Sequence, residues 1–166
     1  MSAHRTRRLP TLGRRGEGWV AAQLVLIAAV LLSPLAAHSR PHGYAPAKYA
    51  VGGVLLALGL LLLVAAGLEL GSSLTPLPAP RTDPTLSLVT TGPYARARHP
   101  MYGAAILFAL GWAIVFDSVA GLAFAVALAV LLDLKARREE LWLTERYPAY
   151  ETYRQRTRHR LLPFVY

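Results

Sequence analysis

Cysteine is absent from this chain of 166 residues. Its absence excludes disulfide bonds, thiolate-bound metal centres and a cysteine nucleophile, and we expect no metal site. Charge is scarce as well, because charged residues make up only 16% of the chain against 54% apolar residues. The length suits one domain, but this composition argues against an ordinary soluble one.

The apolar residues come in continuous blocks rather than at the spacing of an amphipathic helix, a pattern typical of membrane proteins. They predict an all-α, polytopic protein of about four transmembrane helices, at residues 19–37, 49–70, 101–116 and 119–132. The last two blocks are at or below the usual spanning length. Only Asp117 and Ser118 separate them, which predicts a tight helical hairpin with one of these two residues as the N-cap of its second helix.

The chain divides into four parts around these blocks. They are a basic N-terminal tail (1–18), the first two helices (19–70), a proline-rich loop (71–100), and the hairpin with a C-terminal segment (101–166). We expect the last hairpin helix to continue past the membrane to about Arg146, where Pro148 ends it. The second half of the loop mixes apolar and hydrogen-bonding residues in the manner of a site lining.

The first block and its basic tail can also be interpreted as a secretory signal with a cleavage site near Ala37. The apolar stretch is long for the core of a signal, and three further blocks follow it. We therefore expect an uncleaved first helix. Arg7 and Arg8 make a still weaker twin-arginine export signal.

Basic residues predict the orientation of the helices. The N-terminal tail holds five basic residues, the proline-rich loop three and the C-terminal segment eight, whereas the first connection has only Arg40 and Lys48 and the hairpin turn has none. Basic segments flank the cytoplasmic ends of membrane helices. We therefore expect both termini in the cytoplasm, with the protein in a bacterial inner membrane.

The net charge of +9 is at first sight typical of nucleic-acid binding. The basic residues lie beside the apolar blocks, however, where anionic headgroups and orientation signals account for them. No platform of aromatic and basic residues accompanies them. The lipid bilayer, and not nucleic acid, is the expected partner.

Three polar clusters are expected on the cytoplasmic face. They are Thr91 to Tyr102, Lys135 to Glu140, and Tyr147 to Leu162 with its tyrosines and arginines. The hairpin brings the first two together, because Tyr102 starts one of its helices and Lys135 ends the other. The predicted result is one site at the membrane interface.

Each of these residues also has a purely structural interpretation. Pro100 can occupy the first position of a helix whose start is polar, and Glu139 can pair with Lys135 along a solvated helix. Tyrosines are common anchors at a membrane edge. Glu69 lies near the end of its helix, where it can reach the headgroups, so a role as a buried functional carboxylate is the weaker interpretation.

The chemistry of the clusters suits S-adenosylmethionine. Tyrosine and histidine rings can stack on an adenine and tolerate a sulfonium cation. A carboxylate can pair with the ammonium of its amino-acid end, and backbone around Gly92 can supply further hydrogen bonds. Chemistry of this kind is not specific to one ligand.

The order of the motifs adds specificity. The motifs are Leu88-Val89-Thr90-Thr91-Gly92-Pro93-Tyr94, Arg98-His99-Pro100-Met101-Tyr102, Arg138-Glu139-Glu140, Tyr147, Tyr150-Glu151-Thr152-Tyr153 and Leu162-Pro163-Phe164. This series resembles the isoprenylcysteine carboxyl methyltransferase and phospholipid methyltransferase superfamily of integral-membrane enzymes. The resemblance covers roughly residues 86–166, about half of the chain.

The resemblance implies a pocket for S-adenosylmethionine at the cytoplasmic face. By matching motifs, its lining is Leu86, Ser87, Leu88, Val89, Tyr94, His99, Pro100, Met101 and Tyr102. Glu139 or Glu140 would hold the amino-acid end, and Glu139 is favoured. Lys135 or Arg138 would face the methyl acceptor. The chain has fewer helices than the eukaryotic enzymes and a slightly shorter stretch between the glutamate pair and Tyr150.

The expected function is methyl transfer from S-adenosylmethionine to a lipophilic acceptor that enters from the bilayer. A carboxylate acceptor needs only a cation to orient it, whereas an amine must be neutral or lose a proton, for example to His99. The sequence leaves both acceptors open. The alternative is a non-catalytic binding or assembly protein that retains the fold; a small transporter is disfavoured because no span has an ionisable residue at its centre.

Overall fold

The computed structural model describes residues 12–13, 16–36, 46–71 and 88–163. Within these ranges the protein is helical and contains no strand, so the predicted all-α fold is confirmed. The elements in chain order are α1 (Glu17–Ala36), α2 (Pro46–Leu70), the 3-10 helix η2 (Gly92–Ala95), α3 (Pro100–Val115), α4 (Val119–Arg146) and α5 (Tyr150–Arg156).

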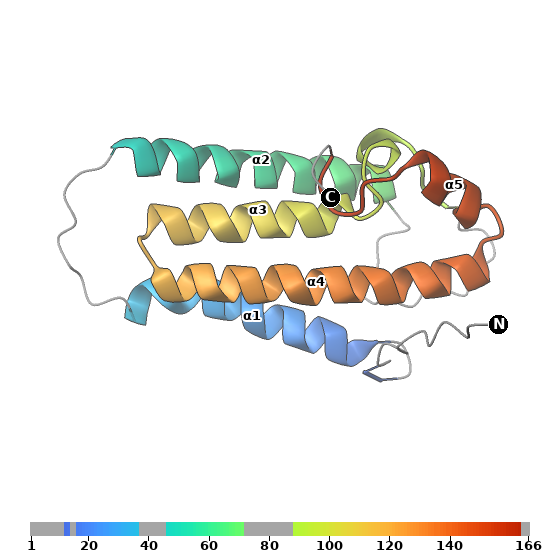
Figure 1. Ribbon diagram of the computed structural model, residues 1–166. Coiled ribbons are helices and arrows are strands. Elements are labelled where there is room, and N and C mark those ends of the chain that lie inside the picture. The colour runs from blue at the N-terminus through green and yellow to red at the C-terminus, as the bar shows by residue number, and fades with distance from the viewer. Residues whose placement is uncertain (1–11, 14–15, 37–45, 72–87, 164–166) are drawn as a thin grey trace, which may run out of the picture.

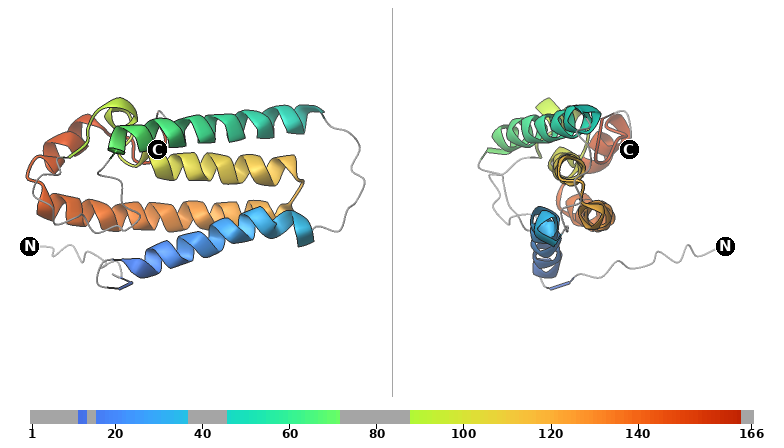
Figure 2. Two further views of the ribbon diagram at one scale, coloured as in Figure 1. Left: turned by 180° about the vertical axis from the view of Figure 1, so that it is seen from behind. Right: turned by 90° about the vertical axis from the view of Figure 1, so that its left-hand side faces the viewer.

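The four long helices form an antiparallel bundle (Figure 1). α3 packs between α2 and α4, and α1 packs mainly on α4. The start of α1, the end of α2, the start of α3 and the end of α4 lie at one end of the bundle together with η2 and α5, and Figure 2 shows the same arrangement from behind. Successive long helices therefore run in opposite directions, as the distribution of basic residues predicts. This arrangement brings the polar clusters to one end of the bundle.

Three of the described helices, α1, α2 and α4, are long and apolar enough to cross a membrane. Their outer faces expose large apolar side chains such as Val25 and Leu68, which are 67% and 78% exposed, as a lipid-facing surface requires. α3 is also apolar but has 16 residues, about 24 Å of helix against a hydrocarbon core of about 30 Å. The chain is an integral membrane protein with three long apolar helices. α3 is a shorter apolar helix, as the sequence predicts.

Glycines allow α2 and α3 to approach closely. A Cβ added at Gly59 of α2 would lie 2.8 Å from the Phe108 backbone nitrogen and 2.9 Å from the Ala104 carbonyl oxygen on α3. Gly111 of α3 meets the Gly52 carbonyl oxygen of α2 in the same way, at 2.7 Å. Helices in membranes associate through such small residues, because lipid supplies no hydrophobic force between them.

The turn between α3 and α4 confirms the predicted hairpin. The hydroxyl of Ser118 caps α4 by accepting a hydrogen bond from the Gly121 backbone nitrogen at 2.9 Å, so Ser118 is the N-cap. It also donates to Ser33 of α1 at 2.8 Å. Asp117 instead forms an ion pair with Lys48 at the start of α2.

α4 ends at Arg146, just before Pro148, as predicted. Its 28 residues extend about 42 Å, so it reaches beyond a bilayer core of about 30 Å by about two turns. The arginines of the N-terminal tail, residues 37–45 of the first connection, and Leu86 and Ser87 of the expected lining lie outside the described residues.

Candidate functional site

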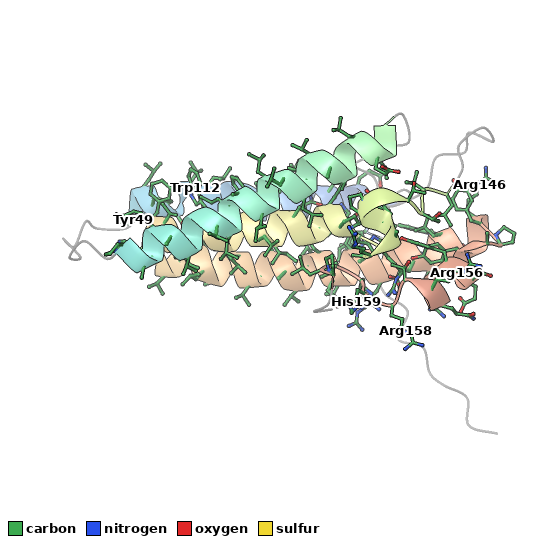
Figure 3. All side chains as sticks on the ribbon, turned by 90° about the horizontal axis from the view of Figure 1, so that it is seen from above. Tyr49, Trp112, Arg146, Arg156, Arg158 and His159 are labelled. Atoms are coloured by element: carbon green, nitrogen blue, oxygen red, sulfur yellow. The ribbon has the colours of Figure 1, made fainter. Side chains whose placement is uncertain are left out.

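Apolar side chains lie along most of the bundle, whereas many polar and charged side chains lie toward one end. Figure 3 shows mostly carbon along the helices, with Arg146, Arg156, Arg158 and His159 gathered toward one end and Tyr49 toward the other. The polar end is the one formed by η2, α5, the start of α3 and the end of α4. The candidate site is built there from residues of α3 and α4.

His99 and Tyr102 form the α3 side of the site. His99 is the N-cap residue of α3, Pro100 takes the first helical position, and Tyr102 follows within the first turn. Because residues three apart lie on one helix face, the two rings stack, with centroids 5.4 Å apart and an interplanar angle of 4°. His99 is buried and Tyr102 partly buried, so both rings have fixed positions.

Glu139 of α4 faces these two rings. Its Oε2 atom accepts a hydrogen bond from the Tyr102 hydroxyl at 2.8 Å and lies 3.7 Å from Nδ1 of His99. The Glu139 side chain retains 22% exposure. The predicted contact between the Arg-His-Pro-Met-Tyr segment and the glutamate pair is therefore confirmed. The Glu139 carboxylate is fixed by a hydrogen bond but remains partly exposed.

Glu140 points to other partners, because adjacent helix positions differ by about 100°. Its Oε1 accepts from Nε of Arg98 at 2.8 Å and from Nε of Arg160 at 3.3 Å. Both the Arg98 and Glu140 side chains are buried. Nε2 of His99 lies 3.4 Å from the same oxygen but forms no hydrogen bond with the described residues.

The charge state of Glu140 follows from this setting, on the polar extension of α4 beyond its apolar part. Burial acts to raise the pKa of Glu140, but His99 and Arg98 together outweigh burial and lower the pKa to about 2. Glu140 is therefore an ionised counter-charge for Arg98 at any physiological pH. This pairing holds the start of α3 against α4.

Lys135 lies at the inner edge of the site. Its side chain is buried at 2% exposure, and Nζ lies 5.0 Å from the centroid of the Tyr102 ring. Nζ also donates to Oε1 of Gln23 on α1 at 2.6 Å. The structural interpretation of Lys135 and Glu139 assumed a solvated helix surface. Lys135 is buried instead, so that interpretation does not hold for it.

Arg138 lies three residues after Lys135, so these two side chains share a face of α4. Its guanidinium lies 4.5 Å from the centroid of the Trp142 ring. Among the described residues its Nε atom is buried without a hydrogen-bond partner. Arg138 is thus held by an aromatic ring rather than by a carboxylate.

Tyr94 comes to the site from η2. It is buried, and burial, reinforced by the charge of Glu139, raises its pKa. Its backbone oxygen accepts from the Tyr153 hydroxyl of α5 at 2.6 Å. Leu88, Val89 and Met101 are half-buried.

The third polar cluster joins the other two through residues 157–161. Arg98 donates from its side chain to the backbone oxygens of Thr157 at 2.7 Å and Arg158 at 2.8 Å. The backbone nitrogen of His99 donates to the Arg160 oxygen at 2.7 Å. The segment therefore lies directly on the start of α3 and keeps His99 from solvent.

Comparison with known proteins fits this arrangement. The sequence profile of the phospholipid methyltransferase family matches residues 47–150. The chain belongs to the phospholipid methyltransferase family. The match runs from α2 to the start of α5, so it includes His99, Tyr102 and the glutamate pair, and it agrees with the integral-membrane methyltransferase group that the motifs resemble.

A similar protein is the cobalt-zinc-cadmium resistance protein CzcN of Cupriavidus metallidurans. It is 36% identical over 72 residues, which cover 43% of this chain and 33% of that protein. The chain thus matches about a third of the length of this relative. Within the part of the chain that the structure describes, no group of three or more His, Asp or Glu side chains is arranged to hold a metal ion.

The residues present in this phospholipid methyltransferase family member fit the cofactor that the family implies. Glu139 is an accessible carboxylate held by Tyr102, and two stacked rings lie beside it. Glu140, by contrast, is taken up by two arginines. This division favours Glu139 of the predicted pair as the partner of a cofactor ammonium.

Sequence reasoning missed Gln23 and Asp133 as members of this region, and it placed Arg160 in the third polar cluster without its partners. Gln23 had a signal, because it and Ser33 are the polar residues that interrupt the first apolar block, and both make hydrogen bonds to the hairpin. Arg160 pairs with Asp133 at 2.9 Å as well as with Glu140. Nothing in the local sequence around Arg160 indicates those partners. Glu69, expected at the headgroups, accepts a hydrogen bond from Thr91 beside η2.

Proposed function

We propose that this protein transfers a methyl group from S-adenosylmethionine to a lipophilic acceptor at the polar end of its helix bundle. Family membership supports a membrane methyltransferase in general. The observation that carries the finer proposal is the Glu139 carboxylate, which the Tyr102 hydroxyl holds beside the His99 ring. This carboxylate is partly exposed and lies beside two aromatic rings, as a site for a cationic, adenine-containing cofactor requires.

In this proposal S-adenosylmethionine supplies an electrophilic methyl group on its sulfonium. Glu139 holds the ammonium of the amino-acid end, and Tyr102 fixes the direction of that carboxylate. The remaining cofactor contacts come from His99, Tyr94, Pro100, Met101 and the segment Leu86 to Val89. Glu140 acts on the cofactor only through Arg98 and the start of α3.

The chain's own contribution to the reaction is alignment and exclusion of water. Residues 157–161 cover the start of α3, and the buried pair of Arg98 and Glu140 fixes the position of His99 relative to α4. Lys135 lies one helical turn before Glu139 on the same α4 face, Arg138 lies beside Lys135, and these two cations would bind the acceptor. A carboxylate acceptor needs only that orientation, whereas an amine acceptor would pass its proton to His99 or Glu139.

We also propose the orientation that the basic residues indicate, with both termini in the cytoplasm of a bacterial inner membrane. The polar end of the bundle then faces the cytoplasmic pool of cofactor. The outer surfaces of α1 and α2 are apolar, so an apolar acceptor would approach the polar end of the bundle from the bilayer.

Methyl transfer can be measured with the purified protein, S-adenosylmethionine carrying a labelled methyl group, and a total lipid extract. The proposal predicts label in the organic phase. Mild alkali then separates the acceptors, because a methyl ester releases its label as methanol and an N-methyl amine retains it. Cofactor binding without transfer to any lipid would support the non-catalytic alternative, and absence of both would contradict the proposed function.

A further inference from the structure

Helix α1 lies outside the family match, which begins at residue 47, yet it reaches the candidate site. Gln23, near the start of α1, accepts a hydrogen bond from the Lys135 ammonium at 2.6 Å. The two residues are 112 positions apart in the chain. This contact ties the helix that the family match omits to the face of α4 that carries Glu139.

The contact matters because Lys135 is only 2% exposed. A buried ammonium is stable only where polar or charged groups surround it. Around Lys135 these include the Gln23 amide oxygen, the Tyr102 ring face 5.0 Å away and the charge of Glu139. The ring face and the charge attract the ammonium without fixing its direction, whereas a short hydrogen bond to an amide oxygen is directional.

The location of this cluster fits a role toward the acceptor. Lys135 lies one helical turn before Glu139 on the same α4 face, nearer to the apolar part of the helix. An acceptor that enters from the bilayer would meet Lys135 before it meets Glu139. A buried lysine ammonium beside an apolar region is a suitable partner for an anionic oxygen on a lipid chain.

We propose that Gln23 is a positioning residue that directs the Lys135 ammonium toward an anionic oxygen of the acceptor, either a carboxylate or a phosphate. The inference rests on the proposed function, because it concerns the acceptor side of the same site. It adds to that function a required contribution from α1. Gln23 itself acts through Lys135 and makes no contact with the reacting atoms.

The test uses three probes with the same chain of twelve carbons: laurate, dodecyl phosphate and dodecanol. Their binding to the full-length protein in detergent is followed by tryptophan fluorescence, and cofactor binding is measured separately by calorimetry. The wild-type protein should bind the two anions more tightly than dodecanol. Gln23→Leu should weaken binding of the anions by about ten-fold, since a hydrogen bond to a charged group is lost, and leave dodecanol and cofactor binding unchanged.

Two further variants separate positioning from a general structural effect. In a Lys135→Met background, Gln23→Leu should cause no additional loss, because coupled residues are not additive. This double variant replaces both polar partners by apolar side chains, so it also avoids leaving a buried ammonium unpaired. Leu24→Ala, at a neighbouring position that is 59% exposed, should change nothing.

The inference is overturned if the wild-type protein shows no preference for the anions, or if Gln23→Leu leaves anion affinity intact. It is also overturned if Gln23→Leu weakens anion binding equally with and without Lys135. The proposed function has its own readout, since failure of the wild-type protein to bind S-adenosylmethionine contradicts that function whatever the anion probes do.

Discussion

At the scale of single residues, some side chains at the polar end of the bundle stabilise the fold and others form the candidate site. Glu140 is buried against Arg98, whereas its neighbour Glu139 receives the Tyr102 hydroxyl and stays partly exposed. A change of about 100° around one helix is enough to give two identical side chains different tasks. Tyr153 belongs to the structural group, because it donates to the Tyr94 backbone from α5.

Tyr153 gives a prediction for alkaline pH. Burial raises its pKa to about 12, compared with about 10 in an unfolded chain. Above pH 10 the unfolded chain therefore loses this proton while the folded protein keeps it, so the free energy of unfolding should fall between about pH 10 and 12. Tyr153→Phe should make that fall shallower, and should cost about 1 kcal/mol at neutral pH because the Tyr94 carbonyl loses its partner.

Unfolding in detergent, followed by circular dichroism from pH 8 to 12, checks this prediction. The fall is not expected to vanish in Tyr153→Phe, because burial also raises the pKa of Tyr150. Identical alkaline profiles for the wild-type protein and the variant would show that Tyr153 is not a buried hydrogen-bonded residue.

At the scale of elements, the site depends on how α2 and α4 hold α3 between them. α3 has 16 residues, and its backbone is close to α2 at Gly52, Gly59 and Gly111. Its N-terminus is fixed against α4 by the pair of Arg98 and Glu140. Both contacts therefore determine the positions of His99 and Tyr102.

Two glycines of α2 offer a matched test of the close contact. Gly59→Ala places a Cβ within 2.8 Å of the α3 backbone, whereas Gly53→Ala meets nothing within 4 Å. Gly59→Ala should destabilise the protein by about 1–3 kcal/mol through overpacking. Gly53→Ala should leave stability unchanged or raise it by up to about 1 kcal/mol through helix propensity.

Thermal unfolding midpoints of the two variants in one detergent provide the comparison. Both substitutions add the same methyl group to the same helix, so lipid or detergent effects cancel. Equal midpoints would contradict a tight α2–α3 interface.

At the scale of the whole molecule, the parts that the sequence predicted are those set by local pattern. Long apolar blocks predict spanning helices, the polar pair Asp117 and Ser118 predicts a cap, and Pro148 predicts an end. The meeting of His99 with the glutamate pair followed from the hairpin alone, because a tight turn leaves little choice of partner. The resemblance in the motifs then indicated the family.

Contacts between distant segments were beyond that reasoning. The hydrogen bond from Lys135 to Gln23 joins helices whose packing no local pattern specifies. Likewise, Arg98 pairs with Glu140 rather than Glu139 because of the direction in which each glutamate points from α4. The pairing also depends on residues 157–161, which lie against the start of α3. Such pairings are selected by tertiary packing.

The orientation of the bundle yields a prediction that the absence of cysteine makes easy to test. Arg158→Cys lies at the polar end, and Val119→Cys lies at the start of α4 at the other end and is 81% exposed in the wild type. A membrane-impermeant maleimide added to intact bacterial cells that express the protein should label position 119 and not position 158. The reverse pattern would contradict both the cytoplasmic termini and access of the site to cytoplasmic cofactor.

The central claim is that Glu139 holds S-adenosylmethionine, and calorimetric titration of the cofactor into the purified protein tests it most directly. The wild-type protein should bind, and Glu139→Gln should lose about thirty-fold or more in affinity, because removing one partner of a shielded charge pair costs about 2–5 kcal/mol. Glu140→Gln should bind nearly as the wild type does but unfold at lower temperature, since Arg98 stays buried without its counter-charge. Absence of binding by the wild-type protein, or equal affinity in Glu139→Gln, would contradict this account of the site.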